Sequence, residues 1–168
     1  PGGVDAHVHM ELPFMGTVSA DDFEAGGASG AAGGTTCFID FCIQGKGEPL
    51  TKAVADWHAK AKKACVDYSY HMAITDFGPN TTAEMREVVE RHGISSFKVF
   101  LAYKGALMVD DGQLYQVMET AARVGAVVTV HAENGDAVWH LQRELTSKGC
   151  MGAEFHPVSR TRSVESEA

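Results

Sequence analysis

The stretch Gly3-Val4-Asp5-Ala6-His7-Val8-His9 places two histidines one residue apart at the end of a short apolar run. Side chains alternate between the two faces of a β-strand, so His7 and His9 would project to the same side, about 7 Å apart. Two imidazoles at this spacing can converge on one metal ion, whereas positions i and i+2 of a helix do not face each other. The alternative is that one of the two is a buried histidine that only makes hydrogen bonds.

Two later apolar segments also carry residues that can bind a metal or react. Ser96-Phe97-Lys98-Val99-Phe100-Leu101-Ala102-Tyr103 contains a lysine, and Val128-Thr129-Val130-His131-Ala132-Glu133-Asn134 contains a third histidine. If all three segments are parallel strands of a barrel, their carboxyl ends meet at one mouth. We therefore expect them to contribute to a single site.

The composition is that of an ordinary globular protein with an acidic balance. The chain has 168 residues, of which 45% are hydrophobic and 21% charged, and its formal net charge is −8 without any basic run. These features argue against nucleic acid and anionic membranes as partners, and no apolar run approaches the length of a membrane span. The four cysteines form no CxxC motif, which is typical of reduced thiols and predicts a cytoplasmic location.

Strand-like and helix-like segments alternate along the chain. Strands are predicted at residues 3–9, 35–41, 68–74, 96–102 and 128–131, and helices at 49–65, 82–92, 111–124 and 136–148. A poorer, Gly-rich helix is expected to begin at Ser19, with Asp22 three residues later, and residues 10–16 are predicted as a loop. Five strand–helix units of this kind indicate a parallel sheet with crossover helices.

Unit length and site position favour a barrel over an open sheet. Five units occupy roughly 34 residues each, so eight would need roughly 270, the usual size of a (β/α)8 barrel. A doubly wound open sheet would bring strands one, four and five together only near a switch point, and no Gly-rich phosphate loop follows the first strand. We predict an α/β fold, a partial TIM (β/α)8 barrel, with residues 1–168 as one incomplete domain of units 1–5.

Lys98 is the most informative residue of the predicted site. It shares a strand face with Phe100 and Ala102, whereas Phe97 and Val99 point to the other face. A buried ammonium is costly, so desolvation and a nearby metal would lower the pKa of Lys98 and leave a nucleophilic amine. Such an amine can take up CO2 to give an anionic carbamate with two oxygens that bridge two cations. The alternative is a lysine that extends to the barrel rim.

His131 and Tyr103 are further candidates at the strand ends. His131 closes a Val-rich strand and would be a ligand of a second metal ion. Tyr103 lies just past the strand of Lys98, where its phenol would donate a hydrogen bond to a developing oxyanion. An aromatic residue that only packs is the competing interpretation of Tyr103.

Four motifs, in their order along the chain, resemble those of one enzyme family. They are HVHM from His7, GGTT from Gly33, FKVFLAYK around Lys98 and VHAENGD around His131. With these motifs the chain resembles the hydantoinase and dihydropyrimidinase group of the amidohydrolase superfamily over nearly its whole length. The resemblance implies that His7 and His9 bind the more buried of two divalent metal ions, usually zinc. It also implies that His131 binds the other and that Lys98 is the bridging N6-carboxylysine. The partial TIM (β/α)8 barrel would then be an incomplete catalytic domain of the metal-dependent hydrolase type.

The resemblance further assigns the substrate side of the site. Tyr103 would contact the substrate carbonyl, and a hydrophobic gate around the substrate's side group would be formed by Leu12, Phe14, Phe100 and Leu107. The implied reaction is hydrolysis of the cyclic amide bond of dihydropyrimidines or hydantoins to N-carbamoyl amino acids, as in pyrimidine catabolism. The substrate would be a small cyclic imide, and the intact enzyme a homotetramer.

Part of the family's barrel is expected to lie outside residues 1–168. Units 6–8, which carry a sixth-strand histidine and an eighth-strand aspartate that acts as ligand and proton shuttle, are not expected here, nor is the flanking β-sandwich. His140, on a predicted helix, and His156, in a predicted loop, do not replace that histidine. The tail from Ser159 to Glu167 departs from the family's SRP…EGEA sequence motif and is expected to hold no catalytic residue. We therefore expect a longer polypeptide or a second chain to complete the barrel, and little turnover by residues 1–168 alone.

Two other interpretations remain open at this stage. The first is another cyclic amidohydrolase, an allantoinase or a dihydroorotase. Dihydroorotases usually carry an arginine two residues after HxH, where this chain has Glu11. The second is a non-catalytic scaffold of the collapsin-response-mediator type, which the retention of His7, His9, Lys98 and His131 argues against.

Overall fold

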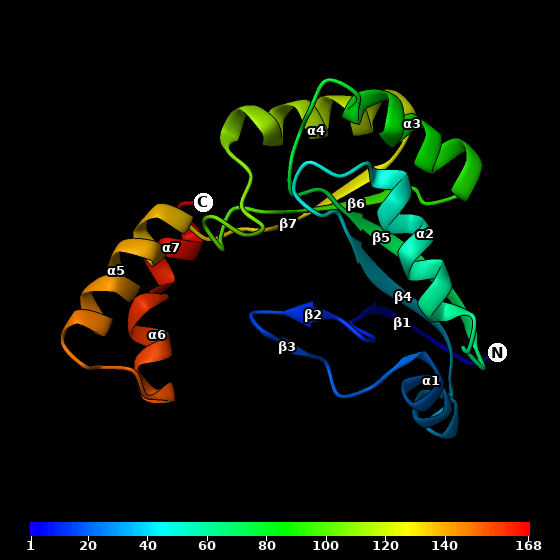
Figure 1. The fold of residues 1–168 in the computed structure, drawn as a ribbon, viewed down its shortest axis with the longest axis horizontal. Coiled ribbons are helices and arrows are strands. Elements are labelled where there is room, and N and C mark those ends of the chain that lie inside the picture. Colours follow the sequence, from blue (N-terminus) through cyan, green and yellow to red (C-terminus); the bar gives the residue numbers. More distant parts are fainter.

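The five long strands of the chain form one parallel sheet in sequence order. A computed structural model describes all residues, 1–168 (Figure 1). The strands are β1 (Gly3–Val8), β4 (Thr35–Ile43), β5 (Asp67–Ala73), β6 (Ser96–Phe100) and β7 (Val127–His131), paired in the order β1-β4-β5-β6-β7. A doubly wound sheet would reverse this order at a switch point. The order therefore confirms the predicted partial (β/α) barrel.

A helix follows each of these strands, as the alternation predicted. The helices are α1 (Phe23–Ala32), α2 (Leu50–Ala61), α3 (Thr81–His92), α4 (Asp111–Val124) and α5 (Gly135–Ser147). The bounds of α4 are those predicted, because Asp110 and Gln113 form a capping box at its start and Gly125 closes it with a left-handed φ of 71°. None of the helices has the length and hydrophobicity that crossing a membrane requires.

The segment after β1 forms a small hairpin rather than the predicted loop. It consists of β2 (Pro13–Phe14) and β3 (Thr17–Val18), and it turns at Met15 and Gly16, which both have positive φ. Strands of two residues are too short for a hydrophobic pattern to reveal. The hairpin lies below the sheet in Figure 1, opposite the side that α2, α3 and α4 cover.

Helix α1 begins at a different residue from the one predicted. Asp22 is the N-cap, since its side chain accepts a hydrogen bond from the Ala25 N–H at 2.7 Å. The Ser19 hydroxyl instead accepts from the Leu12 N–H at 2.8 Å and so joins the two ends of the hairpin segment. Helix α2 is also shorter than predicted, because it ends at Ala61 rather than near Cys65.

The tail of the chain contains short helical turns that the sequence did not predict. A 3-10 turn, η1 (Ala153–Phe155), is followed by α6 (His156–Ser159) and α7 (Arg162–Ser166). His156 therefore begins a helical turn and does not lie in a loop. These turns pack with α5 in a lobe beyond β7, at the left of Figure 1.

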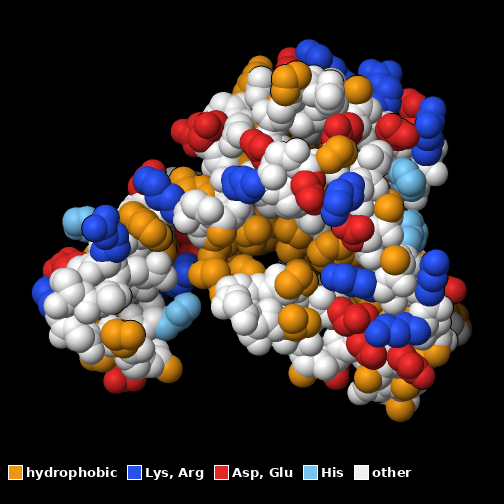
Figure 2. Space-filling model, viewed as in Figure 1, with side chains coloured by type: hydrophobic (Ala, Val, Ile, Leu, Met, Phe, Trp, Pro, Cys, Tyr) orange, Lys and Arg blue, Asp and Glu red, His pale blue; other side chains and the backbone are white.

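The hydrophobic core lies between the sheet and α2, α3 and α4. Its fully buried side chains include Phe23, Leu50, Val54, Met72, Met85, Val88, Phe97, Val99 and Val117. The other face of the sheet is less covered, and the edge strand β1 is mostly exposed. Hydrophobic side chains gather in the hollow at the centre of Figure 2, between the hairpin and the helices. The strands at the two edges of this sheet are β1 and β7.

Asp40 is a carboxyl group buried in this core on β4. It is 1% exposed, and its Oδ1 accepts from the Phe41 N–H at 2.7 Å, while its Oδ2 has no hydrogen-bond partner. Trp57 Nε1 and Tyr70 Oη are also buried without partners, and Tyr70 pairs with Asp40 across the strands. Burial raises the pKa of Asp40 to about 7, although nearby N–H groups oppose the shift.

The raised pKa of Asp40 predicts a pH-dependent stability. The folded state holds this proton more tightly than the unfolded chain, whose pKa is near 3.8. The contribution of Asp40 should therefore be fully present below that value and decrease by up to about 4 kcal/mol as the pH rises to about 7. Urea unfolding of the wild type and of Asp40→Asn across this range measures the difference. Asp67→Asn, at an exposed carboxyl, is the control, and a pH-independent difference between wild type and Asp40→Asn would contradict the prediction.

Candidate active site

One cavity of about 210 Å3 opens at the carboxyl ends of the strands. Its lining contains all nine residues predicted from the sequence: His7, His9, Leu12, Phe14, Lys98, Phe100, Tyr103, Leu107 and His131. Phe41 and Ile43 of β4 complete the lining, and the sequence analysis had given them no role. The structure therefore brings together side chains that lie more than a hundred residues apart.

His7 and His9 lie together at the end of β1, as their strand spacing predicted. Their ring centroids are 5.3 Å apart, and the Phe41 ring packs against both, at 4.5 Å and 5.0 Å. Desolvation is the main cause that lowers the pKa of each histidine, and the positive charge of Lys98 adds to it. Both imidazoles are therefore held in the neutral form that binds metals.

Lys98 lies inside the cavity and does not extend to the rim. It is 8% exposed, while Phe97 and Val99 on either side of it point into the hydrophobic core. Its Nζ is 5.1 Å from the centroid of the Phe100 ring and 5.9 Å from that of Phe41, and it makes no hydrogen bond or ion pair. Burial lowers the pKa of Lys98, so its amine is a better nucleophile than an exposed lysine.

His131 ends β7 and contacts a carboxylate. Its Nε2 donates to Glu133 Oε2 at 2.8 Å, and the same oxygen accepts from Arg160 Nη1 at 2.6 Å. Burial raises the pKa of Glu133, but the hydrogen bonds from His131 and Arg160 outweigh this effect and lower it. The carboxylate fixes the imidazole as the Nε2–H tautomer and leaves Nδ1 as the free donor atom.

Glu133 and Arg160 are site residues that the sequence analysis missed. Glu133 stands two residues after His131, a spacing that in extended backbone returns to the same side, so this signal was present. Arg160 lies in the tail that was expected to hold no catalytic residue, and nothing in its local sequence indicated a contact 27 residues away. The structure does not test that expectation, but it shows that Arg160 contacts Glu133 and lies over the Tyr103 ring.

Tyr103 is held over the cavity by an unusual backbone conformation. Strand β6 ends at Phe100, two residues earlier than predicted, and Tyr103 has a left-handed φ of 62°. Its carbonyl accepts from the N–H groups of Ala106 and Leu107, at 2.9 Å and 3.1 Å, which closes a tight turn. The Tyr103 ring centroid is 5.4 Å from that of Phe14 and 5.4 Å from that of His131. The phenol thus lies between the hairpin and the metal-binding candidates.

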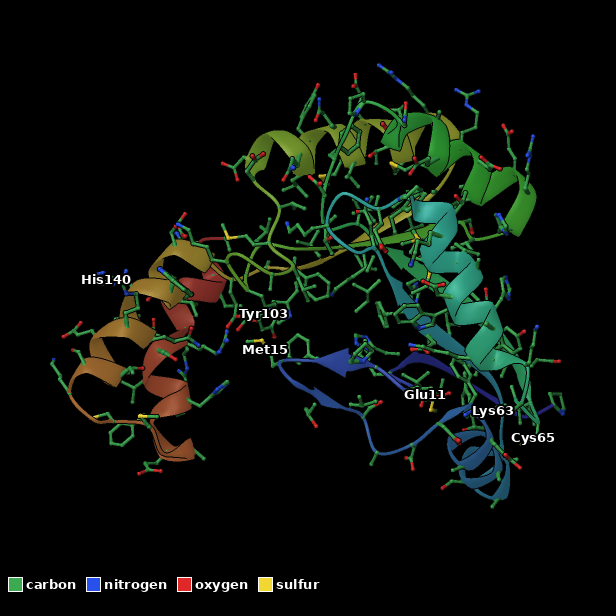
Figure 3. All side chains as sticks on the ribbon, viewed as in Figure 1. Glu11, Met15, Lys63, Cys65, Tyr103 and His140 are labelled. Atoms are coloured by element: carbon green, nitrogen blue, oxygen red, sulfur yellow. The ribbon has the colours of Figure 1, made fainter.

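Of the residues labelled in Figure 3, only Tyr103 lines this cavity. Figure 3 shows Met15, at the hairpin tip, beside Tyr103, whereas Glu11 and Lys63 lie together near α1. Lys63 Nζ is 3.0 Å from Glu11 Oε2, so Glu11 forms an ion pair away from the cavity. His140 lies on an exposed face of α5, far from Tyr103 in the same view, and does not replace a missing ligand.

The family of the chain follows from a comparison with known proteins. The sequence model of the Amidohydrolase family matches residues 1–152. The chain belongs to the amidohydrolase family. It is 46% identical to the D-hydantoinase of Geobacillus stearothermophilus and 44% identical to the dihydropyrimidinase of Dictyostelium discoideum, in both cases over 100% of this chain. It covers only 36% and 34% of those two relatives, so it spans about a third of their length.

Solved structures of this amidohydrolase family have the same fold over the whole chain. A crystal structure of D-hydantoinase matches with a TM-score of 0.97 at 45% identity and covers 100% of this chain and 37% of its own. A dihydropyrimidinase from Brevibacillus agri matches with a TM-score of 0.97 at 43% identity, and an L-hydantoinase from Arthrobacter aurescens with 0.79 at 27%. Both comparisons cover 100% of this chain and 37% of the solved one.

The donor chemistry of the amidohydrolase cavity fits a metal centre of which this chain supplies a part. His7 and His9 offer neutral nitrogens on one side and His131 on the other, with the strand of Lys98 between them in the sheet. No three His, Cys, Asp or Glu side chains lie close enough together to hold a metal ion by themselves. No carboxylate lines the cavity, and the unpartnered Lys98 amine is the group best placed to become an anionic ligand.

The lowered pKa of Lys98 predicts its reactivity in the metal-free protein. We expect its amine to become reactive at a lower pH than that of the exposed Lys62, because burial disfavours the ammonium form. Competitive labelling with trace acetic anhydride over a range of pH, followed by mass spectrometry of the peptides, gives the midpoint for each lysine. Comparing midpoints removes the effect of accessibility. Identical midpoints for Lys98 and Lys62 would contradict the prediction.

Proposed function

We propose that the protein carrying this chain is a cyclic amidohydrolase that opens dihydropyrimidines or hydantoins to N-carbamoyl amino acids. The observation that carries the proposal is the convergence of His7, His9, Lys98, His131 and Tyr103 on one cavity. The names of the relatives, D-hydantoinase and dihydropyrimidinase, support the same substrate class. Since the chain spans about a third of these relatives, the activity belongs to a longer polypeptide or to an assembly.

The metal centre we propose contains two divalent cations, with zinc as the expected metal. His7 and His9 would hold one cation and His131 the other, through the nitrogens that the structure leaves free. The Lys98 amine would attack the carbon of CO2 and release a proton to solvent, and the resulting N6-carboxylysine would offer one oxygen to each cation. The cations, when bound, would supply a hydroxide at neutral pH and polarise the substrate carbonyl.

The other cavity residues would bind and orient the ring. The Tyr103 phenol would donate a hydrogen bond to the ring carbonyl oxygen as the carbonyl carbon becomes tetrahedral. The apolar wall of Leu12, Phe14, Phe100 and Leu107 would hold the substituent of the ring and exclude water. No carboxylate lines the cavity, so the proton for the leaving nitrogen would come from residues outside 1–168.

The remaining features of the proposal concern assembly and location. The protein would be a homotetramer in the cytoplasm, with a role in pyrimidine catabolism. Residues 1–168 would form the first five units of a single barrel domain, and the open edges of β1 and β7 are where further strands would pair.

A substrate panel tests the proposed function. We expect the full polypeptide that carries residues 1–168 to hydrolyse dihydrouracil and hydantoin and to leave dihydroorotate unchanged, because Glu11 gives no cation for its carboxylate. Allantoin is included, since faster hydrolysis of allantoin would indicate an allantoinase instead. Metal analysis of the same sample should give two divalent cations per chain. Neither metal nor turnover with any of the four compounds would indicate a scaffold and overturn the proposal.

The role of Tyr103 has its own test. In Tyr103→Phe we expect kcat to fall roughly 10²–10³-fold with little change in KM, because the lost hydrogen bond strengthens only as the oxyanion develops. Steady-state kinetics on dihydrouracil measure both constants. Tyr115→Phe, at an exposed position on α4, is the matched control. If KM rises while kcat is unchanged, Tyr103 binds the ring but does not stabilise the oxyanion.

A further inference from the structure

The tail of the chain folds back on the turn that follows β7. The Asn134 N–H donates to the carbonyl of Val164 at 2.9 Å, and the Asn134 side chain contacts Glu167. Val164 is 7% exposed and anchors this part of the tail. The backbone of the tail is therefore tied to the residues that directly follow His131.

Arg160 reaches from this tail into the site. Its side chain is 16% exposed, and its Nη1 donates to Glu133 Oε2 at 2.6 Å. The guanidinium carbon lies 5.6 Å from the centroid of the Tyr103 ring, so the same group also faces the aromatic ring. Its Nε is buried without a hydrogen-bond partner. Arg160 therefore contacts Tyr103, which lines the cavity, and Glu133, which bonds to the cavity residue His131.

Glu133 is the link between Arg160 and the candidate metal ligand. Its side chain is 13% exposed, and one oxygen, Oε2, accepts from both Arg160 and His131. A carboxylate bonded to one partner alone is free to rotate, whereas two donors at one oxygen define its direction. The ring of His131 is oriented in turn, because its Nε2–H must point at this oxygen.

We propose that Arg160 is a positioning residue that orients two parts of the site together: His131, through Glu133, and Tyr103, through its ring. The inference rests on the proposed function, since the orientation of His131 and Tyr103 matters only if they bind a metal and a substrate. A planar guanidinium donates within its plane and presents a flat face to an aromatic ring, which a lysine ammonium does not. Replacing the guanidinium by an ammonium therefore separates the effect of Arg160 on His131, through Glu133, from its effect on the Tyr103 ring.

The test compares Arg160→Gln and Arg160→Lys in the full polypeptide, with Arg162→Gln as the matched control. Arg162 lies two residues further along the tail, is exposed and makes no ion pair. For each folded variant, verified by thermal melting, three quantities are measured: the tightly bound metal per chain, the visible spectrum of the Co2+-substituted protein, and kcat and KM on dihydrouracil.

The two variants should differ in a defined way. Arg160→Gln should weaken the metal held by His131 by roughly 10–100-fold, reducing bound metal towards one per chain, and should change the Co2+ spectrum and lower kcat. Arg160→Lys keeps a positive charge beside Glu133, so its metal content should approach the wild type. Its kcat should still be reduced with KM unchanged, because the face over Tyr103 is lost. Arg162→Gln should match the wild type in all three.

Several outcomes would overturn the inference. Metal content, spectrum and kcat of Arg160→Gln within twofold of the Arg162→Gln values would show that Arg160 only anchors the tail. If Arg160→Gln does not fold, Glu133→Gln decides, because this nearly isosteric change should reproduce the weakened metal binding, and normal metal binding would refute the link. A wild type that has neither metal nor turnover would overturn the proposed function itself, and the inference with it.

Discussion

The site depends on an amine that is buried without a counterion. Lys98 lies in a strand whose other face is part of the hydrophobic core, and its Nζ lies 5.9 Å from the ring centroid of Phe41 and 5.1 Å from that of Phe100. A permanent ammonium in this place would be costly, so the surroundings favour the neutral amine or an anionic product of it. The rest of the cavity is consistent with an anionic product of the Lys98 amine. It offers neutral imidazoles and no carboxylate, so among the residues that line it the Lys98 amine is the one that we propose to become an anionic ligand.

The alternation of side chains in β6 explains how one strand serves both the core and the site. Phe97 and Val99 are fully buried on the outer face, where α3 and α4 cover the sheet, and Lys98 and Phe100 lie on the inner face. The sequential strand order then decides which residues meet. In a curled, singly wound sheet the carboxyl ends of β1, β6 and β7 face a common mouth, although β1 and β7 are at opposite edges. The alternation of side chains along the strands therefore determines both the packing of the sheet and the residues of the site.

The placement of the site by side-chain alternation and strand order explains which features were predictable from the sequence. The residues of the cavity lie on strand ends or in short loops directly after them, so alternation and the family motifs together located all nine. The ends of α3 and α4 were predicted correctly because a glycine with left-handed φ follows each helix. The start of α1 was wrong because Ser19 and Asp22 are both good N-caps, and the choice depends on a tertiary hydrogen bond from Leu12 to Ser19. Arg160 was missed for the same reason, since its partners are distant in the chain and its segment has no periodic pattern.

The division between strands and loops also separates the proposed metal ligands from the proposed substrate contacts. His7, Lys98 and His131 belong to strands whose hydrogen bonds and core packing hold them in place. Leu12, Phe14, Tyr103 and Leu107 belong to the hairpin and to the loop after β6, where backbone conformation, including the left-handed Tyr103, directs the side chains. Changes in loop residues alter the shape of the apolar wall without moving the nitrogen donors. Tyr103 is the exception, because its ring contacts both His131 and Phe14, so the position of the proposed oxyanion donor is coupled to the wall that we propose to hold the substrate.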